Sequence, residues 1–177
     1  SKIYIPFNKE YDSFNIQELI MERYYLIKNK FKFFELEKDT NGAAETVLLT
    51  LNEIKENIPV MVIDCDNFYE YDIINSWNGD NKIFTFISKS LDNKFSYVLN
   101  GTAQNQNSDF VTKIEEKNKI SDIACTGAYG FKSTFDLRKY CKIIIDNKKT
   151  FKGEYYISCV IDEMIKDKFS FTNQNID

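Results

Sequence analysis

Apolar positions in the first half of the chain follow two different periods. A spacing of three or four residues predicts helices, whereas short apolar or aromatic runs predict strands. The predicted elements up to residue 77 alternate between strand and helix: 2–6 strand, 13–27 helix, 31–36 strand, 43–54 helix, 59–63 strand and 70–77 helix. Such alternation is typical of an α/β sheet with right-handed crossovers.

The second half begins with consecutive strands. The predicted strands are 82–87, 94–99, 110–114 and 123–131, with a polar loop at 101–108. Helices at 133–145 and 154–166 follow, and a last strand begins at 169–171. We therefore expect a mostly parallel central sheet flanked by helices, with an inserted antiparallel section. The length of 177 residues suits one domain spanning 1–177.

Composition excludes several classes of protein. The net charge of −4 argues against a broad surface that binds nucleic acid. The sequence has no run of 18 apolar residues, so no membrane span is predicted. The chain has no histidine, which excludes Ser-His-Asp and Cys-His nucleophile pairs and zinc bound by histidine. Chemistry must come from carboxylates, lysine, tyrosine, backbone amides or a hard metal ion.

The four cysteines, at 65, 125, 141 and 159, each lie in an apolar stretch and are widely spaced. Zinc sites need closely paired ligands, and small secreted folds show tighter cysteine frameworks. We expect four buried free thiols in a reducing compartment, the cytoplasm.

The most informative segment is the apolar run 59–63, which ends in Asp64 and Asp66. Ligands of open α/β sheets bind beyond the carboxyl ends of the strands. Carboxylate oxygens at this place suit Mg²⁺, which commonly takes one or two protein carboxylates together with phosphate oxygens. The alternative is structural: Asp64 caps the turn and Asp66 caps the helix that follows.

An Asp-x-Asp sequence after an apolar strand also occurs in phosphatases that use an aspartyl nucleophile. Those enzymes resemble this chain only in that motif, which they carry near the N-terminus. Here about 60 residues precede Asp64, and Asn67, Phe68 and Tyr69 follow the motif. This hypothesis is therefore the weaker one.

Four segments in order resemble the sugar-1-phosphate nucleotidyltransferases, including glucose-1-phosphate thymidylyltransferases and capsule-type enzymes. They are Thr40-Asn41-Gly42-Ala43-Ala44-Glu45-Thr46, Val62 to Tyr69, Lys113-Ile114-Glu115-Glu116-Lys117 followed by Thr126-Gly127-Ala128-Tyr129, and Gly153-Glu154-Tyr155-Tyr156. The resemblance covers residues 2–172. It implies the nucleotide-diphospho-sugar transferase fold, which is Rossmann-like and of the GT-A kind.

The resemblance implies a role for each matching residue. Asp66 would bind Mg²⁺ and act in catalysis with Lys117. Gly42, Ala43 and Asp64 would bind the nucleotide, whereas Glu116, Lys117, Gly127 and Glu154 would bind the sugar phosphate. The implied partners are a nucleoside triphosphate and a sugar-1-phosphate, with phosphocholine or another phosphoalcohol as an open alternative, and the chain could assemble as a homo-oligomer.

Structural explanations remain open for the same residues. The charged residues 115–119 would form a solvated turn, Gly42 a helix start and Gly127 a strand bulge. Glu154 would be an ordinary acidic residue in a first helical turn, and Ser96 and Tyr97 would only reflect the alternation of a surface strand.

The chain also departs from the family pattern. Relatives begin with a strand and a Gly-rich loop carrying Arg and Lys, and they continue beyond the last predicted strand. We therefore expect a domain that is incomplete at both ends, and the second hypothesis is a non-catalytic binding or assembly module with the same fold.

Overall fold

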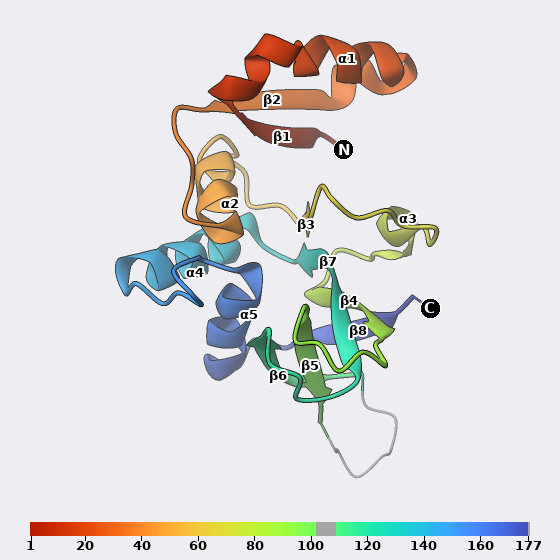
Figure 1. Ribbon diagram of the computed structural model, residues 1–177, viewed down its shortest axis with the longest axis vertical. Coiled ribbons are helices and arrows are strands. Elements are labelled where there is room, and N and C mark those ends of the chain that lie inside the picture. The colour runs from red at the N-terminus through yellow and green to blue at the C-terminus, as the bar shows by residue number, and fades with distance from the viewer. Residues whose placement is uncertain (102–108, 177) are drawn as a thin grey trace.

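A computed structural model describes residues 1–101 and 109–176, except for the side chains of residues 11 and 12. The predicted loop 101–108 lies outside the described residues from 102 onward. Figure 1 shows a layer formed by β1 (Ile3–Asn8), β2 (Phe31–Leu36) and α1 (Ile16–Arg23) at one end, a group of helices, and a larger sheet beside them.

The larger sheet has six strands in the described residues: β3 (Val60–Ile63), β4 (Lys82–Ile87), β5 (Ser96–Asn100), β6 (Val111–Glu116), β7 (Ile123–Phe131) and β8 (Thr172–Asn175). The order along the sheet is β6-β5-β7-β4-β8, and β3 also pairs with β7. The predicted strands 82–87 and 123–131 are confirmed to the residue. The last strand begins at Thr172, slightly later than predicted.

Strand β7 determines the character of the sheet. It pairs antiparallel with β3, β4 and β5, while β4 pairs parallel with β8. Four strands therefore run in one direction, and β7 and β6 run in the other. The α/β class with a mostly parallel strand direction and an antiparallel section is confirmed. Direct neighbours, however, are mostly antiparallel because β7 lies between strands of the opposite direction.

Strands β3 and β5 lie along β7 at different heights. Strand β3 pairs with residues 128–131 of β7, whereas β5 meets β7 at Ala124. The carboxyl end of β3 and the amino end of β5 therefore approach the same middle section of β7. The register between β4 and β7 shifts there, between Ile83 and Thr85, and Gly127 has a φ of 83°. The bulge expected at Gly127 is thus present.

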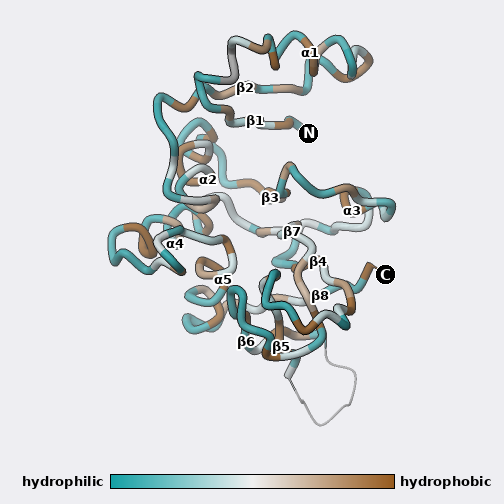
Figure 2. Tube along the Cα trace, in the orientation of Figure 1, coloured by the Kyte–Doolittle hydropathy of each residue, from teal (hydrophilic) through white to brown (hydrophobic). Residues whose placement is uncertain are grey.

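Three helices cover the sheet: α2 (Ala43–Leu51), α4 (Thr134–Asp146) and α5 (Ile157–Lys166). Ser133 is the N-cap of α4, and its side chain accepts a hydrogen bond from the amide of Asp136. The main core includes Leu51, Ile83, Phe131, Leu137, Ile144, Ile161 and Phe171, all almost fully buried. Figure 2 shows hydrophobic residues along β3, β4 and β5. Along the helices, hydrophobic and hydrophilic residues alternate.

The single helix predicted at 13–27 is wrong in its extent. The structure has a 3-10 helix at Lys9–Phe14, α1 at Ile16–Arg23 and a second 3-10 helix at Tyr25–Lys30. Asn15 has a φ of 51°, which an α-helix does not allow. None of the residues of α1 is buried, so no tertiary packing extends the helix.

The remaining predicted elements shift only at their ends. Strands β1 (Ile3–Asn8) and β2 (Phe31–Leu36) pair in parallel as a separate two-stranded sheet. Helix α3 is reduced to Ile73–Ser76, and Asp72 caps it. Helix α5 begins three residues later than predicted. No helix in the described part of the chain is long and apolar enough to cross a membrane.

Glu163 links α5 to the loop before it, and this link gives a pH-dependent prediction. Hydrogen bonds from Lys149 and Lys166 hold the pKa of Glu163 below its ordinary value. The stabilisation is therefore present above about pH 4.5 and is lost as the pH falls through the lowered pKa. We expect Glu163→Gln to reduce the free energy of unfolding by about 0.5–1 kcal/mol at pH 7 and by less at pH 3, as measured by urea denaturation.

The exposed Glu53 supplies the control for this prediction. Its side chain has no hydrogen bond or ion pair with any described residue, so Glu53→Gln should change stability equally at both pH values. An equal effect of Glu163→Gln at pH 7 and pH 3 would contradict the prediction.

Candidate functional site

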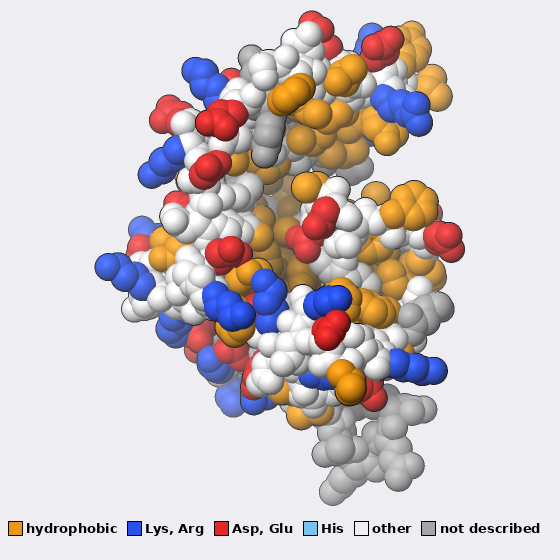
Figure 3. Space-filling view, viewed as in Figure 1, with side chains coloured by type: hydrophobic (Ala, Val, Ile, Leu, Met, Phe, Trp, Pro, Cys, Tyr) orange, Lys and Arg blue, Asp and Glu red, His pale blue; other side chains and the backbone are white. Residues whose placement is uncertain are grey.

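A pocket of about 630 Å³ lies where β3 ends, β5 begins and α5 begins. Six of the eight residues predicted for the site line it: Ala43, Asp64, Asp66, Glu116, Lys117 and Gly127. Gly42 and Glu154 do not line it. Figure 3 shows this face of the molecule hollowed, with acidic side chains beside the hollow and basic side chains below it.

The two aspartates follow β3 directly. The amide of Asp64 donates to the carbonyl of Gly127 (2.9 Å), which extends the pairing of β3 with β7 by one residue. A Cβ atom at residue 127 would overlap the carboxylate of Asp64 and would lie 2.7 Å from Nδ2 of Asn67. Glycine at this position therefore makes room for the Asp64 side chain at the pocket wall.

Negative charge accumulates at this end of the pocket. Partial removal from water raises the pKa of Asp64 to about 6, and the neighbouring Asp66 and Glu116 add to this increase. Like charges that destabilise one another's ionised forms are stabilised by a bound cation. The electrostatics at Asp64 and Asp66 therefore favour a divalent ion.

The capping alternative for the aspartates is not supported. Asp72, rather than Asp66, caps α3: its carboxylate accepts hydrogen bonds from N and Nδ2 of Asn75 at 3.0 and 2.7 Å. Among the described residues, no hydrogen bond reaches the carboxylate of Asp64 or Asp66. Both carboxylates are thus available to a ligand.

The described residues contain no group of three or more His, Cys, Asp or Glu side chains arranged to hold a metal by themselves. Mg²⁺ does not require such a group, because it keeps several water molecules and takes further oxygens from substrate phosphates. Asp64 and Asp66 provide the one or two carboxylates that such an ion uses. The donor set therefore fits Mg²⁺ bound together with a phosphorylated substrate.

The loop after the aspartates is fixed to β7. The carbonyl of Thr126 accepts hydrogen bonds from Nδ2 of Asn67 (3.0 Å) and from the hydroxyl of Tyr69 (2.7 Å). The hydroxyl of Thr126 donates to the carbonyl of Phe84 in β4 (3.0 Å). These contacts hold the loop against the middle of the sheet and thereby fix the backbone that carries Asp66.

Glu116, the last residue of β6, also lines the pocket. Its Oε2 accepts hydrogen bonds from the hydroxyls of Ser96, which faces it across the β5–β6 pair, and Ser158 (2.6 Å). Only 6% of its side chain is exposed. The expectation of a solvated charged turn is therefore wrong for Glu116, and also for Glu115, which lies in β6 and pairs with Lys113.

Lys117 is fixed at its backbone and at its side chain. Its φ of 48° turns the chain sharply after β6, and its amide donates to the carbonyl of Phe95 (3.0 Å). Its Nζ donates to the hydroxyl of Tyr156 (2.6 Å), which in turn donates to Oε2 of Glu154 (2.5 Å). The hydrogen bond with Tyr156 is the main cause that raises the pKa of Lys117.

Gly42 has a structural reason to be glycine. Its φ is 121°, and a Cβ atom there would lie 2.7 Å from both N and O of Tyr155. Tyr155 N donates to the carbonyl of Asn41 (2.7 Å), and Ala44 N donates to the carbonyl of Tyr155 (2.9 Å). This close backbone contact joins the start of α2 to the segment before α5 and brings Ala43 to the pocket.

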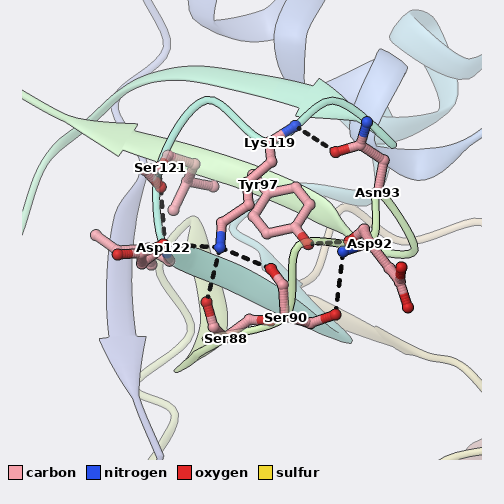
Figure 4. Close-up of polar contacts among 10 residues, drawn as sticks. Ser88, Ser90, Asp92, Asn93, Tyr97, Lys119, Ser121 and Asp122 are labelled. Atoms are coloured by element: carbon pink, nitrogen blue, oxygen red, sulfur yellow. Dashed lines mark hydrogen bonds and ion pairs between the residues drawn. The ribbon is translucent and has the colours of Figure 1, made fainter.

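Lys119 stabilises the loop between β4 and β5 (Figure 4). Its Nζ donates to the carbonyls of Ser88 (3.1 Å) and Ser90 (2.7 Å) and pairs with Asp122 (2.8 Å). Only 19% of the side chain is exposed, so Lys119 is not part of a solvated turn. The loop leads directly into residues 94–96, which belong to the pocket wall.

Three residues that line the pocket were not predicted for the site: Ser96, Tyr156 and Ser158. Ser96 was expected on a surface strand, but it is 9% exposed, and the neighbouring Tyr97 is fully buried. No local pattern marks a serine that reaches a glutamate 20 or 42 residues away in sequence.

Cys65 also differs from expectation, since it is exposed, whereas Cys125 and Cys141 are buried and all four thiols are free.

Comparisons with known proteins give matches only among solved structures. No family model matches the chain, and no curated protein matches it. A nucleoside-diphosphate-sugar pyrophosphorylase from Vibrio cholerae superposes with a TM-score of 0.79 and 23% identity, over 99% of this chain and 73% of that one.

Two further structures cover 99% of this chain. A Bacillus anthracis protein assigned as a glucose-1-phosphate thymidylyltransferase, in complex with sucrose, has a TM-score of 0.69, 20% identity and 68% of its own length covered. The CTP:phosphocholine cytidylyltransferase of Streptococcus pneumoniae has a TM-score of 0.67, 14% identity and 69% covered. With these similarities and the geometry of the pocket, the chain has the fold of the sugar-1-phosphate nucleotidyltransferases.

Proposed function

We propose that this chain carries the active site of a Mg²⁺-dependent nucleotidyltransferase that joins a nucleoside triphosphate to a sugar-1-phosphate. The observation that carries the proposal is the pocket itself. The carboxylates of Asp64, Asp66 and Glu116 and the ammonium of Lys117 belong to residues that line it. Acidic groups for a metal ion and a basic group for a phosphate thus share one cavity.

In the proposed reaction, a phosphate oxygen of the sugar-1-phosphate attacks the α-phosphorus of the triphosphate. A new bond from this oxygen to the α-phosphorus forms, and the bond from the α-phosphorus to the oxygen that bridges it to the β-phosphate breaks. The products are a nucleotide sugar and pyrophosphate. Catalysis of such transfers depends mainly on positioning and charge neutralisation, so the absence of histidine is no obstacle.

The residues of the pocket divide between these tasks. Asp66, with Asp64 beside it, would hold Mg²⁺, which supplies positive charge to the phosphate oxygens when bound. The ammonium of Lys117 would neutralise the phosphate of the sugar. Glu116 uses Oε2 for the two serines, which leaves Oε1 to accept a hydrogen bond from a sugar hydroxyl.

Ala43 and Gly127 would complete the substrate contacts. Ala43 lies at the pocket where α2 begins, and it would face the nucleotide. Gly127 would allow close approach of the sugar, in addition to making room for Asp64. For Gly42 and Glu154 an indirect role is proposed, because Gly42 packs on Tyr155 and Glu154 bonds to Tyr156.

Pyrophosphate release tests the function. The wild-type chain should release pyrophosphate when Mg²⁺, one of the five common nucleoside triphosphates and an acceptor are all present. The acceptor panel contains glucose-1-phosphate and phosphocholine. These two compounds occur in the names of two enzymes of similar structure. Omitting the acceptor or the metal should abolish the release.

The other outcomes separate the alternatives. If a nucleotide sugar binds with measurable heat but no pyrophosphate is released with any pair, the chain is a binding module with this fold. If inorganic phosphate is released from the acceptor alone, the phosphatase hypothesis replaces the transferase. In either case the proposed function is rejected.

Ser158→Ala tests the role of Glu116. The side chain of Ser158 is 2% exposed, and its hydroxyl donates one of the two hydrogen bonds to Oε2 of Glu116. We expect the KM for the acceptor to increase about threefold to tenfold, because a hydrogen bond typically makes a net contribution of about 0.5–1.5 kcal/mol. The KM for the triphosphate should change less than twofold, as measured by initial rates.

Ser170→Ala is a suitable control for this prediction. Ser170 lies in the loop before β8, outside the residues that line the pocket, so both KM values should stay at the wild-type level. Equal increases in the two KM values with Ser158→Ala would contradict a specific role in acceptor binding.

A further inference from the structure

The tip of Lys117 is held by a residue that the proposed reaction does not use. A lysine side chain has four rotatable bonds, and fixing it costs up to about 2 kcal/mol of conformational entropy. The hydroxyl of Tyr156 accepts the hydrogen bond from Nζ at 2.6 Å, and the ring of Tyr156 lies 4.5 Å from the same atom. The position of the ammonium group is thus fixed before any ligand binds.

Glu154 determines the orientation of the tyrosine hydroxyl. The hydroxyl has a single proton, which it donates to Oε2 of Glu154 at 2.5 Å. Its lone pairs are therefore free to accept from Lys117. The three groups form an ordered chain from ammonium to hydroxyl to carboxylate, in which each hydrogen bond involves one charged partner and is thereby strengthened.

The geometry leaves part of Lys117 available to a ligand. Its side chain is 34% exposed, and its ammonium has three donors, of which Tyr156 occupies one. The nearest carboxylate oxygen, Oε1 of Glu116, lies 3.9 Å away, beyond hydrogen-bond distance. Two donors can therefore reach the phosphate group of an acceptor in the pocket.

We propose that Tyr156, oriented by Glu154, is a positioning residue that holds the Lys117 ammonium toward the anionic phosphate of the acceptor. This inference rests on the proposed function for the identity of that phosphate. It gives Glu154 an indirect role, through Tyr156, in place of direct contact with the sugar. Tyr156 belongs to the segment that precedes α5, so the start of this helix determines where the ammonium lies.

Tyr156→Phe tests the proposal, because phenylalanine keeps the ring and removes only the hydroxyl. We expect the KM for the acceptor to increase about threefold to tenfold, with kcat and the KM for the triphosphate changed less than twofold. Glu154→Gln should give a smaller change in the same direction. Tyr155→Phe is the matched control, since no hydrogen bond of the Tyr155 hydroxyl occurs among the described residues, and it should leave both KM values unchanged.

A second measurement does not depend on activity. In protein labelled with ¹³C-lysine, the Cε signal of Lys117, assigned with Lys117→Arg, reports the titration of its ammonium. The Tyr156 hydroxyl raises the pKa of Lys117, so Tyr156→Phe should lower that pKa, whereas Tyr155→Phe should not. Addition of inorganic phosphate should shift the Cε signal in the wild type and shift it less, at equal concentration, in Tyr156→Phe.

The outcomes distinguish the two claims. If the wild type releases no pyrophosphate but the Lys117 signal responds to phosphate and to Tyr156→Phe as expected, the proposed function fails and the positioning role stands. If the Lys117 titration and phosphate response in Tyr156→Phe equal those of the wild type, the positioning role is overturned. A uniform loss of thermal stability with equal changes in both KM values would also overturn it, because that pattern indicates a structural residue only.

Discussion

Replacing Asp66 by asparagine is expected to lower kcat/KM for pyrophosphate release by about 100- to 1000-fold. The change keeps the size of the side chain and removes one negative charge. Loss of a preorganised electrostatic contact with the reacting groups typically costs on the order of this factor. Asp66 lines the pocket, and no hydrogen bond from a described residue ties up its carboxylate, so the folded structure should be retained.

The effect should appear together with weaker metal dependence. Initial rates measured across a Mg²⁺ titration should reach half of their maximum at a higher metal concentration in Asp66→Asn than in the wild type. Asp146→Asn, at the exposed end of α4 and outside the pocket, is the control and should leave the rates unchanged. Activity of Asp66→Asn within threefold of the wild type would contradict the assignment of Asp66 as the metal-binding residue.

Gly42→Ala is expected to reduce the free energy of unfolding by about 3–4 kcal/mol. Two costs combine at this position. The φ of 121° with a ψ of 173° belongs to a region that side chains rarely adopt, which costs roughly 1–3 kcal/mol. The added Cβ would also lie 2.7 Å from backbone atoms of Tyr155, which cannot move without disturbing the hydrogen bonds that join α2 to the segment before α5.

Gly153→Ala separates these two costs. Gly153 also has a positive φ, 90°, but a Cβ there would have nothing within 4 Å. It should cost only about 1 kcal/mol, from backbone conformation alone. Chemical denaturation of both variants measures the difference, and equal losses of stability would show that the contact with Tyr155 contributes nothing.

Local sequence patterns predicted much of the fold because the responsible forces act over a few residues. The strands 31–36, 82–87 and 123–131 were predicted to the residue, since each is a bounded apolar or aromatic run. The helix predicted at 13–27 failed for the opposite reason. Its apolar spacing is helical, but no residue of α1 becomes fully buried, and the segment divides into one α-helix and two 3-10 helices.

The site was predictable only where the sequence itself carries the chemistry. Two carboxylates directly after an apolar run indicated a ligand site, and Asp64 and Asp66 both line the pocket. Gly42 and Gly127 were identified as unusual positions, but the contacts that require glycine there come from Tyr155 and Asp64. Those contacts join segments far apart in the chain and leave no local signal.

The sequence by itself determined the α/β class, the location of the acidic turn and the exclusion of histidine chemistry, because these depend on composition and on short-range periodicity. The tertiary structure alone decided that Glu116 is buried between Ser96 and Ser158, and that Tyr156 links Lys117 to Glu154. The physical reason is the same in each case. A polar group that leaves water must find a hydrogen-bond partner, and which partner it finds depends on how β5, β6 and α5 pack together.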